Sequence, residues 1–124
     1  MQPPAPSPDR PAVWSALSEL FLDTDTALGR SARAERLARS PYTLAQLEAI
    51  LIHEVQPVCS ANLHTPAGEW AGFDADTLAA RIQAHLGSHG HRWLRRWLPG
   101  RVHPMVRDEW QATANAVIQR RRRE

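Results

Sequence analysis

The protein has 124 residues, of which 43% are hydrophobic and 23% are charged, and it contains a single cysteine. One cysteine excludes a disulfide framework and a four-cysteine metal site, and no uninterrupted apolar run approaches the ~18 residues that a membrane-spanning helix needs. The hydrophobic fraction is too high for a disordered chain, and the length suits one folded domain.

The charged residues are unevenly distributed along the chain. Residues 1–80 contain five basic and ten acidic side chains, whereas residues 81–124 contain ten basic and three acidic ones. Every basic residue is an arginine. Such a division favours a nucleic-acid partner or a charged protein partner. The alternative is that the two parts neutralise each other within the fold.

The N-terminus predicts an arm followed by a helix. Five of the ten prolines fall within the first 11 residues, so residues 1–10 are expected to be extended. They lack the basic and apolar regions of a secretory signal. Asp9 is a good N-cap for a first helix that runs to about Leu22. Its apolar stripe comprises Val13, Trp14, Leu17, Leu20 and Phe21.

A second helix is predicted from Ala27 to Arg39. Pro41 ends it, because the residue before a proline avoids the helical conformation. The residues expected to face inward are Leu28, Ala32, Leu37 and Ala38. The charged residues expected to remain in water are Arg33, Glu35 and Arg36.

The strongest helical pattern follows Thr43, which fits a capping box with Gln46. Its apolar face comprises Leu44, Leu47, Ile50, Leu51 and Val55. Pro57 is expected to break or kink this helix, and a further short turn of helix is expected over residues 58–63. Residues 64–72 contain Pro66 and two glycines and predict an ordered loop.

Asp74 is expected to cap the next helix, which ends at Gly87. Its apolar stripe comprises Leu78, Ile82 and Leu86. A short tryptophan-rich helix is expected within residues 91–100, and a last helix begins at Pro104. The inward positions of that last helix are Val106, Trp110, Thr113, Ala114 and Val117.

No window alternates with the two-residue period of a strand. The sequence therefore predicts an all-α fold, a compact single-domain bundle of five to six helices over residues 11–119. A Pro-rich arm (1–10) precedes the domain, and a basic tail (120–124) follows it.

The histidines raise the question of a metal site, since His85, His89 and His91 have a spacing like that of metal ligands. Gly87 interrupts the helix that would place His85 and His89 on one face. A zinc site also needs a third protein ligand; His103 could supply it, but nothing in the spacing demands this. A polar loop is the simpler interpretation, and neither a metal site nor a cofactor is predicted.

Glu54, His64 and Glu69 are a candidate for general acid–base chemistry, provided that they converge on a pocket. Alternatively, Glu54, Asn62 and Glu69 satisfy backbone groups around Pro57 and the loop. The sequence contains no nucleophile elbow and no P-loop. Cys59 has no basic neighbour and predicts an ordinary buried thiol.

The C-terminal third offers a possible nucleic-acid surface, because arginine forks bind phosphate and tryptophans stack on bases. The arginines are Arg92, Arg95, Arg96, Arg101, Arg107, Arg120, Arg121, Arg122 and Arg123, and the tryptophans are Trp93, Trp97 and Trp110. The competing interpretation places the tryptophans in the core and the last arginines at a helix C-terminus, where the helix dipole favours cations.

Several motifs resemble a small uncharacterised bacterial family, a domain of unknown function. They are ALSELFLDT at 16–24, EVQPV at 54–58 and AGEWAGF at 67–73. The likeness covers about residues 10–86 and leaves out the chain beyond Gly87. The resemblance implies no activity and implies a bacterial, cytoplasmic setting. It singles out for mutation Glu54, Asn62, Glu69 and Trp70.

We expect a small non-enzymatic protein that acts by protein–protein interaction through a charged surface, as an immunity protein, antitoxin or adaptor does. Its acidic part suits a basic toxin or effector. The expected partner-binding residues are Asp23, Asp25, Glu54, Asn62, Glu69, Trp70, Asp74 and Asp76. The alternatives are nucleic-acid binding through the basic third, and an enzyme that uses Glu54, His64 and Glu69.

Overall fold

The computed structural model describes residues 9–22, 26–60, 74–88 and 100–123, and every element within these ranges is helical. The predicted all-α fold is therefore confirmed for the described part of the chain. The elements are α1 (Asp9–Ser18), η1 (Glu19–Phe21), η2 (Thr26–Gly29), α2 (Arg30–Arg39), α3 (Leu44–Ile50), η3 (Leu51–Val55), α4 (Gln56–Cys59), α5 (Ala75–Ser88) and α7 (Pro104–Arg123).

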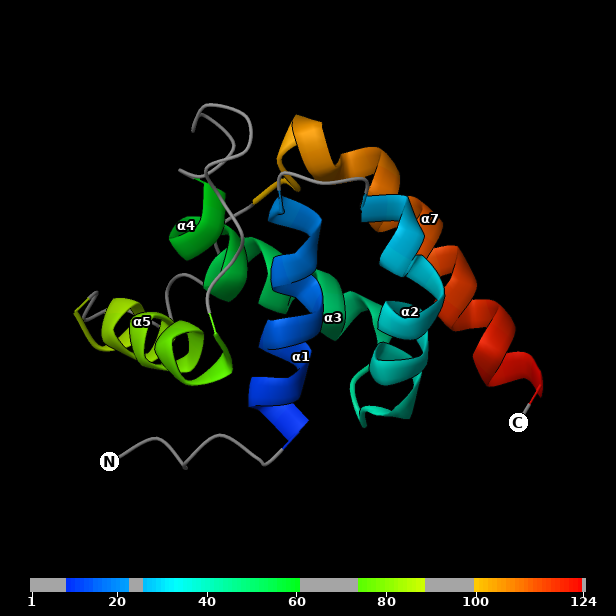
Figure 1. Cartoon of the computed structure of the whole chain (residues 1–124), viewed down its shortest axis with the longest axis horizontal. Helices are drawn as coiled ribbons and strands as arrows, with labels where there is room; N and C mark the ends of the chain where they lie inside the picture. The colour runs from blue at the N-terminus through cyan, green and yellow to red at the C-terminus, as the bar shows by residue number, and fades with distance from the viewer. Residues whose placement is uncertain (1–8, 23–25, 61–73, 89–99, 124) are drawn as a thin grey trace.

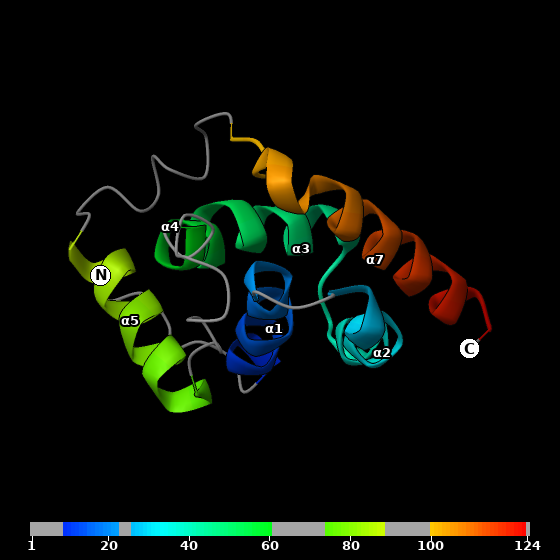
Figure 2. The ribbon, with the colours of Figure 1, turned by 45° about the horizontal axis from the view of Figure 1, so that its top comes forward.

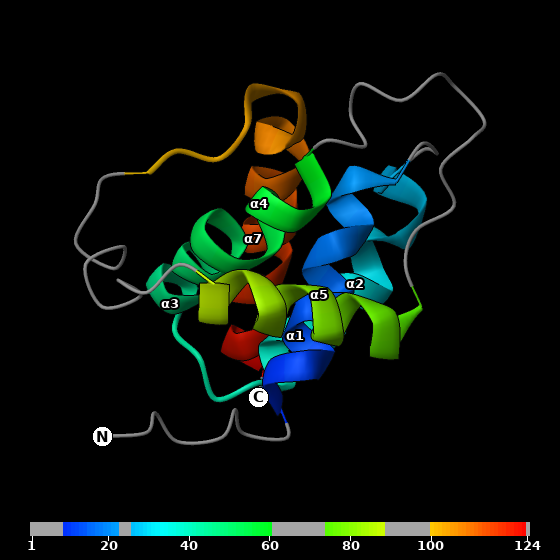
Figure 3. The same cartoon turned by 90° about the vertical axis from the view of Figure 1, so that its left-hand side faces the viewer.

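Helix α1 lies at the centre of the molecule, with α2 on one side and α5 on the other (Figures 1 and 2). The helix formed by α3, η3 and α4 crosses α1, and η3 contacts both α1 and α5. Helix α7 packs along α2, which is the most extensive contact between two helices. Viewed from the side, α5 lies in front and α7 lies behind the α3–α4 helix (Figure 3).

The core forms around α1. Its predicted apolar stripe is confirmed, because each of its five members is at most 3% exposed. Trp14 and Phe21 are among the largest buried side chains. An aromatic side chain buries ~200 Å², which at ~25 cal/mol per Å² contributes roughly 5 kcal/mol before the entropy cost of ordering it.

The inward face predicted over η2 and α2 is confirmed in part, since Leu37 and Ala38 are buried. Leu28, expected to face inward, is 85% exposed, and Ala32 is exposed as well. Arg33, expected to remain in water, is 0% exposed and lies beside Ala34 and Leu37. The prediction is wrong at Arg33 because a charged side chain enters the interior when it finds charged and polar partners there.

The Arg33 guanidinium finds those partners in η1, η2 and α7. Its Nη2 donates to Glu109 Oε2 (2.9 Å), to the carbonyl oxygen of Thr26 (3.1 Å) and to Thr113 Oγ1 (3.1 Å), and its Nη1 lies 3.6 Å from Glu19 Oε1. Burial lowers the pKa of Arg33, and the carboxylates of Glu109 and Glu19 oppose that effect.

Glu109 is the acceptor that joins α2 to α7. Arg30 holds its carboxylate with two hydrogen bonds of 2.6 and 2.7 Å, and Arg33 adds a third. The hydrogen bond from Arg30 is the main cause that lowers the pKa of Glu109, burial opposes it, and the charges of Arg30 and Arg33 add to it. The ion pairs that Glu109 forms with Arg30 and Arg33 thus join arginines of the acidic first part to a carboxylate of the basic third.

The predicted basic tail is wrong, because Arg120 to Arg123 form the last turn of α7. Arg121 closes the C-terminus of α2, where the last carbonyl groups lack partners within the helix. It donates, over 2.7–3.3 Å, to the carbonyl oxygens of Leu37, Ala38, Ser40 and Tyr42. Arg120 donates to Ser31 Oγ (2.7 Å).

The helix that begins at Leu44 continues through Pro57 instead of breaking there. Its segment η3 is a π-helix, in which the N–H of Gln56 bonds to the carbonyl of Leu51, five residues back. A proline lacks the N–H of a regular helix, and its ring clashes with the carbonyl four residues before it. The wider π-helical turn accommodates both effects, so α4 follows directly.

The helix caps follow the prediction at two N-termini. Gln46 N–H donates to Thr43 Oγ1 (3.1 Å) and Thr43 N–H donates to Gln46 Oε1 (2.9 Å), which is the predicted capping box. Asp74 Oδ1 accepts the N–H of Thr77 (2.9 Å) at the start of α5.

Two predicted boundaries are wrong. Helix α5 extends to Ser88, past Gly87, and α1 includes Asp9 and Arg10, which the sequence assigned to the arm. The tryptophan-rich helix expected within residues 91–100 lies outside the described residues, apart from Gly100. In α7 the predicted inward positions Val106, Trp110, Thr113 and Val117 are confirmed as buried.

Replacement of Arg33 by methionine is expected to lower the free energy of unfolding by about 3 kcal/mol, because it leaves part of a buried ionic network without its cation. Arg36→Met is the matched control: Arg36 pairs with Glu19 but its side chain is 39% exposed, so we expect a loss within ~1 kcal/mol. Urea unfolding followed by circular dichroism measures both. Equal losses would contradict the structural role of Arg33.

The lowered pKa of Glu109 predicts a pH dependence of stability. A carboxyl group with a depressed pKa in the folded state stabilises the fold above its unfolded pKa of ~4.3, and this stabilisation is lost as the pH falls towards the folded pKa. The difference in unfolding free energy between the protein and its Glu109→Gln variant should therefore narrow from pH 7 to pH 3. The lowered pKa of Asp74, caused by Thr77, is common to both proteins and cancels. A difference that stays constant over this range would refute the prediction.

Candidate functional site

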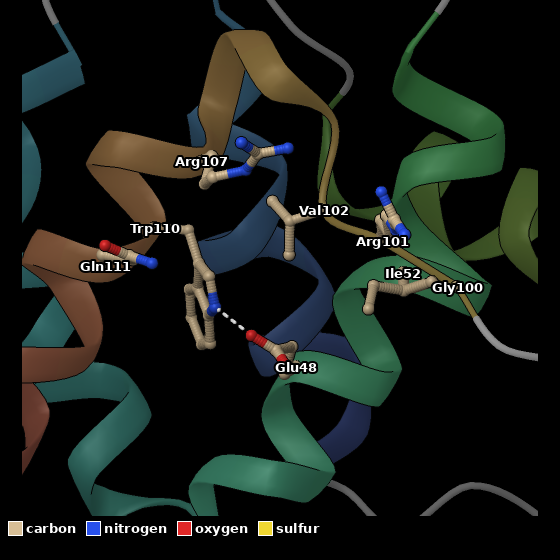
Figure 4. A pocket seen from close by; sticks show the side chains of 8 residues that line it. All are labelled: Glu48, Ile52, Gly100, Arg101, Val102, Arg107, Trp110 and Gln111. Atoms are coloured by element: carbon tan, nitrogen blue, oxygen red, sulfur yellow. Dashed lines mark hydrogen bonds between the residues drawn. The ribbon is translucent and has the colours of Figure 1, made fainter.

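An open cleft of about 390 Å³ lies between the α3–η3 helix and the first half of α7 (Figure 4). Its lining combines two cations, one carboxylate, one amide and apolar groups. The lining residues are Glu48, Ile52, Gly100, Arg101, Val102, Arg107, Trp110 and Gln111.

One wall of the cleft is the segment before α7, which Gln56 holds against the helix. Gln56 Nε2 donates to the carbonyl oxygen of Arg101 (2.9 Å), and its Oε1 accepts the N–H of His103 (2.7 Å). At Gly100 a Cβ atom would lie 2.4 Å from Ile52 Cγ2, so only glycine permits this approach. Arg101 is therefore fixed through its backbone at the rim of the cleft.

The floor of the cleft is fixed by a hydrogen bond between α7 and α3. Trp110 Nε1 donates to Glu48 Oε1 over 2.9 Å, and Figure 4 shows this bond as a dashed line below Val102. Trp110 is only 3% exposed, whereas Glu48 is exposed. The indole ring therefore belongs to the core and borders the cleft by its edge.

The cations of the cleft are unpaired within the described part of the chain. Arg101 and Arg107 are both exposed, and neither forms an ion pair there. In Figure 4 their guanidinium groups lie on either side of Val102. The first five arginines of the chain, by contrast, are all in ion pairs: Arg10, Arg30, Arg33, Arg36 and Arg39. The cleft can therefore accept an anionic group.

Glu54, expected both as a partner-binding residue and as an acid–base group, lies in the interior and is 8% exposed. Arg10 Nε and Trp14 Nε1 donate to its Oε1 (3.0 and 2.8 Å), and Arg10 Nη2 donates to its Oε2. Arg10 also lies over the Tyr42 ring, 5.3 Å from its centroid. Both oxygens of Glu54 thus tie α1 to η3, which does not suit contact with a partner.

Two opposing effects act on the pKa of the Arg10 guanidinium. Burial lowers its pKa, and the hydrogen bonds and charge interactions with Glu54 and Tyr42 outweigh that effect, so the pKa of Arg10 is raised. The pair is therefore a stable structural contact of α1.

The other expected partner-binding residues divide into two groups. Asp74 and Asp76 are exposed at the start of α5, where Asp74 also serves as the cap. The remaining five lie outside the described residues: Asp23, Asp25, Asn62, Glu69 and Trp70. His64 lies outside them as well, so the convergence of Glu54, His64 and Glu69 concerns a part of the chain that is not described.

The arginines expected to bind nucleic acid are also separated. Arg101 lines the cleft, Arg120 and Arg121 bond to groups of α2 and its C-terminal turn, and Arg122 and Arg123 are exposed at the end of α7. Three lie outside the described residues: Arg92, Arg95 and Arg96.

The described residues contain no group of three histidine, cysteine, aspartate or glutamate side chains that could hold a metal ion. His89 and His91 lie outside these residues. Cys59 is 1% exposed, and burial raises the pKa of its thiol to about 12, which agrees with the predicted inert thiol. None of the described helices is both long and apolar enough to cross a membrane.

Sequence reasoning missed several parts of the cleft, namely Glu48, Ile52 and Gln111. One signal was available in α7, where Gln111 follows Arg107 by four residues and so shares a helix face with it. Glu48 and Ile52 gave no comparable signal, because their place in the site depends on the packing of α3 against α7.

The described residues form a small helical domain with an open cleft between α3–η3 and α7. A family model, the Domain of unknown function DUF7079, matches residues 8–120, and the chain belongs to this family. The resemblance inferred from the motifs is confirmed, but its expected limit near residue 86 is wrong, because the match includes most of α7 and the cleft. No curated protein and no solved structure matches the chain.

The position of Glu54 leads to a stability prediction. Glu54→Gln keeps an acceptor for Trp14 but removes the ion pair with Arg10, so we expect a loss of about 2 kcal/mol in unfolding free energy. The control is Glu35→Gln, which removes a surface pair with Arg39 and should cost less than ~0.5 kcal/mol. Thermal and urea unfolding measure the difference. Equal effects of the two substitutions would show that the Arg10 pair does not stabilise the fold.

Proposed function

We propose that this protein is a small non-enzymatic module that acts by protein–protein interaction, as an immunity protein, antitoxin or adaptor does, and that its partner binds in the cleft between α3–η3 and α7. The observation that carries the proposal is that Arg101 and Arg107, at a cleft of about 390 Å³, form no ion pair with any residue that the structure describes.

The cleft is prepared for binding. Gln56 and Gly100 fix the wall that carries Arg101, and the bond between Trp110 and Glu48 fixes the floor. A surface whose backbone is already ordered loses less entropy when a partner binds. Unpaired charges at such a surface provide electrostatic complementarity, which selects the partner and speeds association.

The positive charge of the cleft favours a different partner-binding surface from the one that the sequence predicts. The sequence favoured an acidic surface and a basic partner. Several carboxylates are engaged with arginines, however: Glu19, Glu35, Glu54 and Glu109. Asp74 and Asp76 are the members of the expected acidic surface that remain exposed in the described chain. The proposed interface therefore lies on the cationic side.

Nucleic-acid binding receives less support. Trp110 is buried and offers no face on which a base could stack. Arg120 and Arg121 already bond to α2 and its C-terminal turn.

An enzymatic role also receives less support from the cleft. Among the described residues that line it there is no serine, threonine, cysteine or histidine, and Glu48, the one carboxylate among them, accepts a hydrogen bond from Trp110. The nearby Glu54 has both oxygens occupied by Arg10 and Trp14. Recognition of an anionic group is the chemistry that these side chains supply.

Site-specific photocrosslinking tests the proposal. A benzoylphenylalanine residue replaces Gln111 in the cleft or Ala80 on the exposed side of α5, one turn after Asp76. In cells that express the protein natively, we expect a discrete protein adduct from position 111 that disappears when Arg101→Glu and Arg107→Glu are combined.

The control position separates the alternatives. An adduct from position 80 alone would refute the cleft as the interface and would indicate that the partner binds the acidic surface near Asp76. An adduct that nuclease treatment removes would favour nucleic acid. No adduct at either position would refute the proposal. Circular dichroism of each variant establishes that the fold is retained.

A further inference from the structure

We infer that the cleft recognises an acidic peptide segment, in which a side-chain carboxylate is held by Arg101 and Arg107 while a neighbouring apolar side chain packs on Ile52 and Val102. This inference rests on the proposed function and specifies the chemistry of the partner. It follows from the charge, the shape and the mixed polarity of the lining residues.

The carboxylate is inferred from the two guanidinium groups. A guanidinium is a planar fork that matches the two oxygens of a carboxylate, and the resulting hydrogen bonds are stronger than those between neutral groups. Arg101 and Arg107 lie on either side of Val102 and form no ion pair within the described residues (Figure 4). A carboxylate at this position would neutralise the two guanidinium charges, which no ion pair within the described residues neutralises.

The apolar neighbour is inferred from the surface between and beside the arginines. Val102 is 8% exposed and belongs to the core, and Ile52 packs against that core while also lining the cleft. An aliphatic side chain on these two residues would remove apolar surface from water. A ligand that consists of charge alone, such as free phosphate, would leave this surface uncovered.

A peptide is inferred from the polar groups and the size of the cleft. Gln111 offers both a donor and an acceptor on the α7 side of the cleft, which suits the N–H and C=O groups of an extended chain. The volume of about 390 Å³ lies near the lower end of the ~300–1,000 Å³ that ligand sites occupy. It accommodates a short peptide segment.

Binding of short peptides to the full chain tests the inference. The probes are the blocked peptide Ac-Ala-Asp-Leu-Asp-Ala-NH2, its analogue with asparagine in place of both aspartates, and its analogue with serine in place of leucine. The readout is the shift of the Trp110 indole resonance in ¹H–¹⁵N NMR spectra at ~0.15 M salt, where distant surface charges are screened. Each analogue should bind about tenfold more weakly than the parent peptide.

Two charge variants provide the comparison within the protein. Arg101→Glu combined with Arg107→Glu should abolish binding of the acidic peptide and favour the matching peptide with arginine in place of aspartate. Arg122→Glu combined with Arg123→Glu makes the same change of net charge at the exposed end of α7 and should leave the affinity within about twofold. Equal losses in the two double variants would overturn the inference.

Phosphate sources are included as separate probes. Stronger binding of inorganic phosphate, or of a short single-stranded oligonucleotide, than of the acidic peptide would overturn the inference. So would equal affinity for the aspartate and asparagine peptides. A crosslinked partner at position 111 together with no binding of the acidic peptide would refute this inference and leave the proposed function intact. Binding of the acidic peptide with no protein adduct in cells would refute the proposed function.

Discussion

The burial of Arg33 between α2 and α7 is the constraint on which the arrangement of the molecule depends. A guanidinium that is 0% exposed must find acceptors, and it finds them in Glu109 and Thr113 of α7. Arg121 forms a second link twelve residues beyond Glu109, which corresponds to ~18 Å along the helix. Helix α7 is therefore held to α2 at two points and has one register.

That register determines what the other side of α7 presents. With Glu109 directed towards α2, Trp110 reaches α3 and bonds to Glu48, and Arg107 lines the cleft. The contacts between α2 and α7 also neutralise part of the charge asymmetry of the sequence. Arginines of the acidic part neutralise Glu109 of the basic part, whereas Arg101 and Arg107 form no ion pair within the described residues.

The sequence predicts those features of the fold that depend on neighbouring residues. The stripe of α1, the capping box at Thr43 and the cap at Asp74 are local patterns, and the structure agrees with them. Arg33 was misplaced because a pattern of hydrophobicity assigns charge to the surface, while its partner Glu109 lies 76 residues away. The continuation through Pro57 was missed because a π-helical turn has no signature in composition.

The candidate site was the least predictable feature, and the reason is geometric. Gly100 reads as part of a turn, yet its role is to let the backbone before Arg101 approach Ile52 more closely than a residue with a Cβ atom would permit. Gln56 reads as an ordinary polar residue of a helix, yet it holds both neighbours of Val102 through their backbones. Because glycine loses more conformational freedom on folding than other residues, its use here costs stability. That cost is offset if a fixed Arg101 lowers the entropy lost when a partner's carboxylate binds.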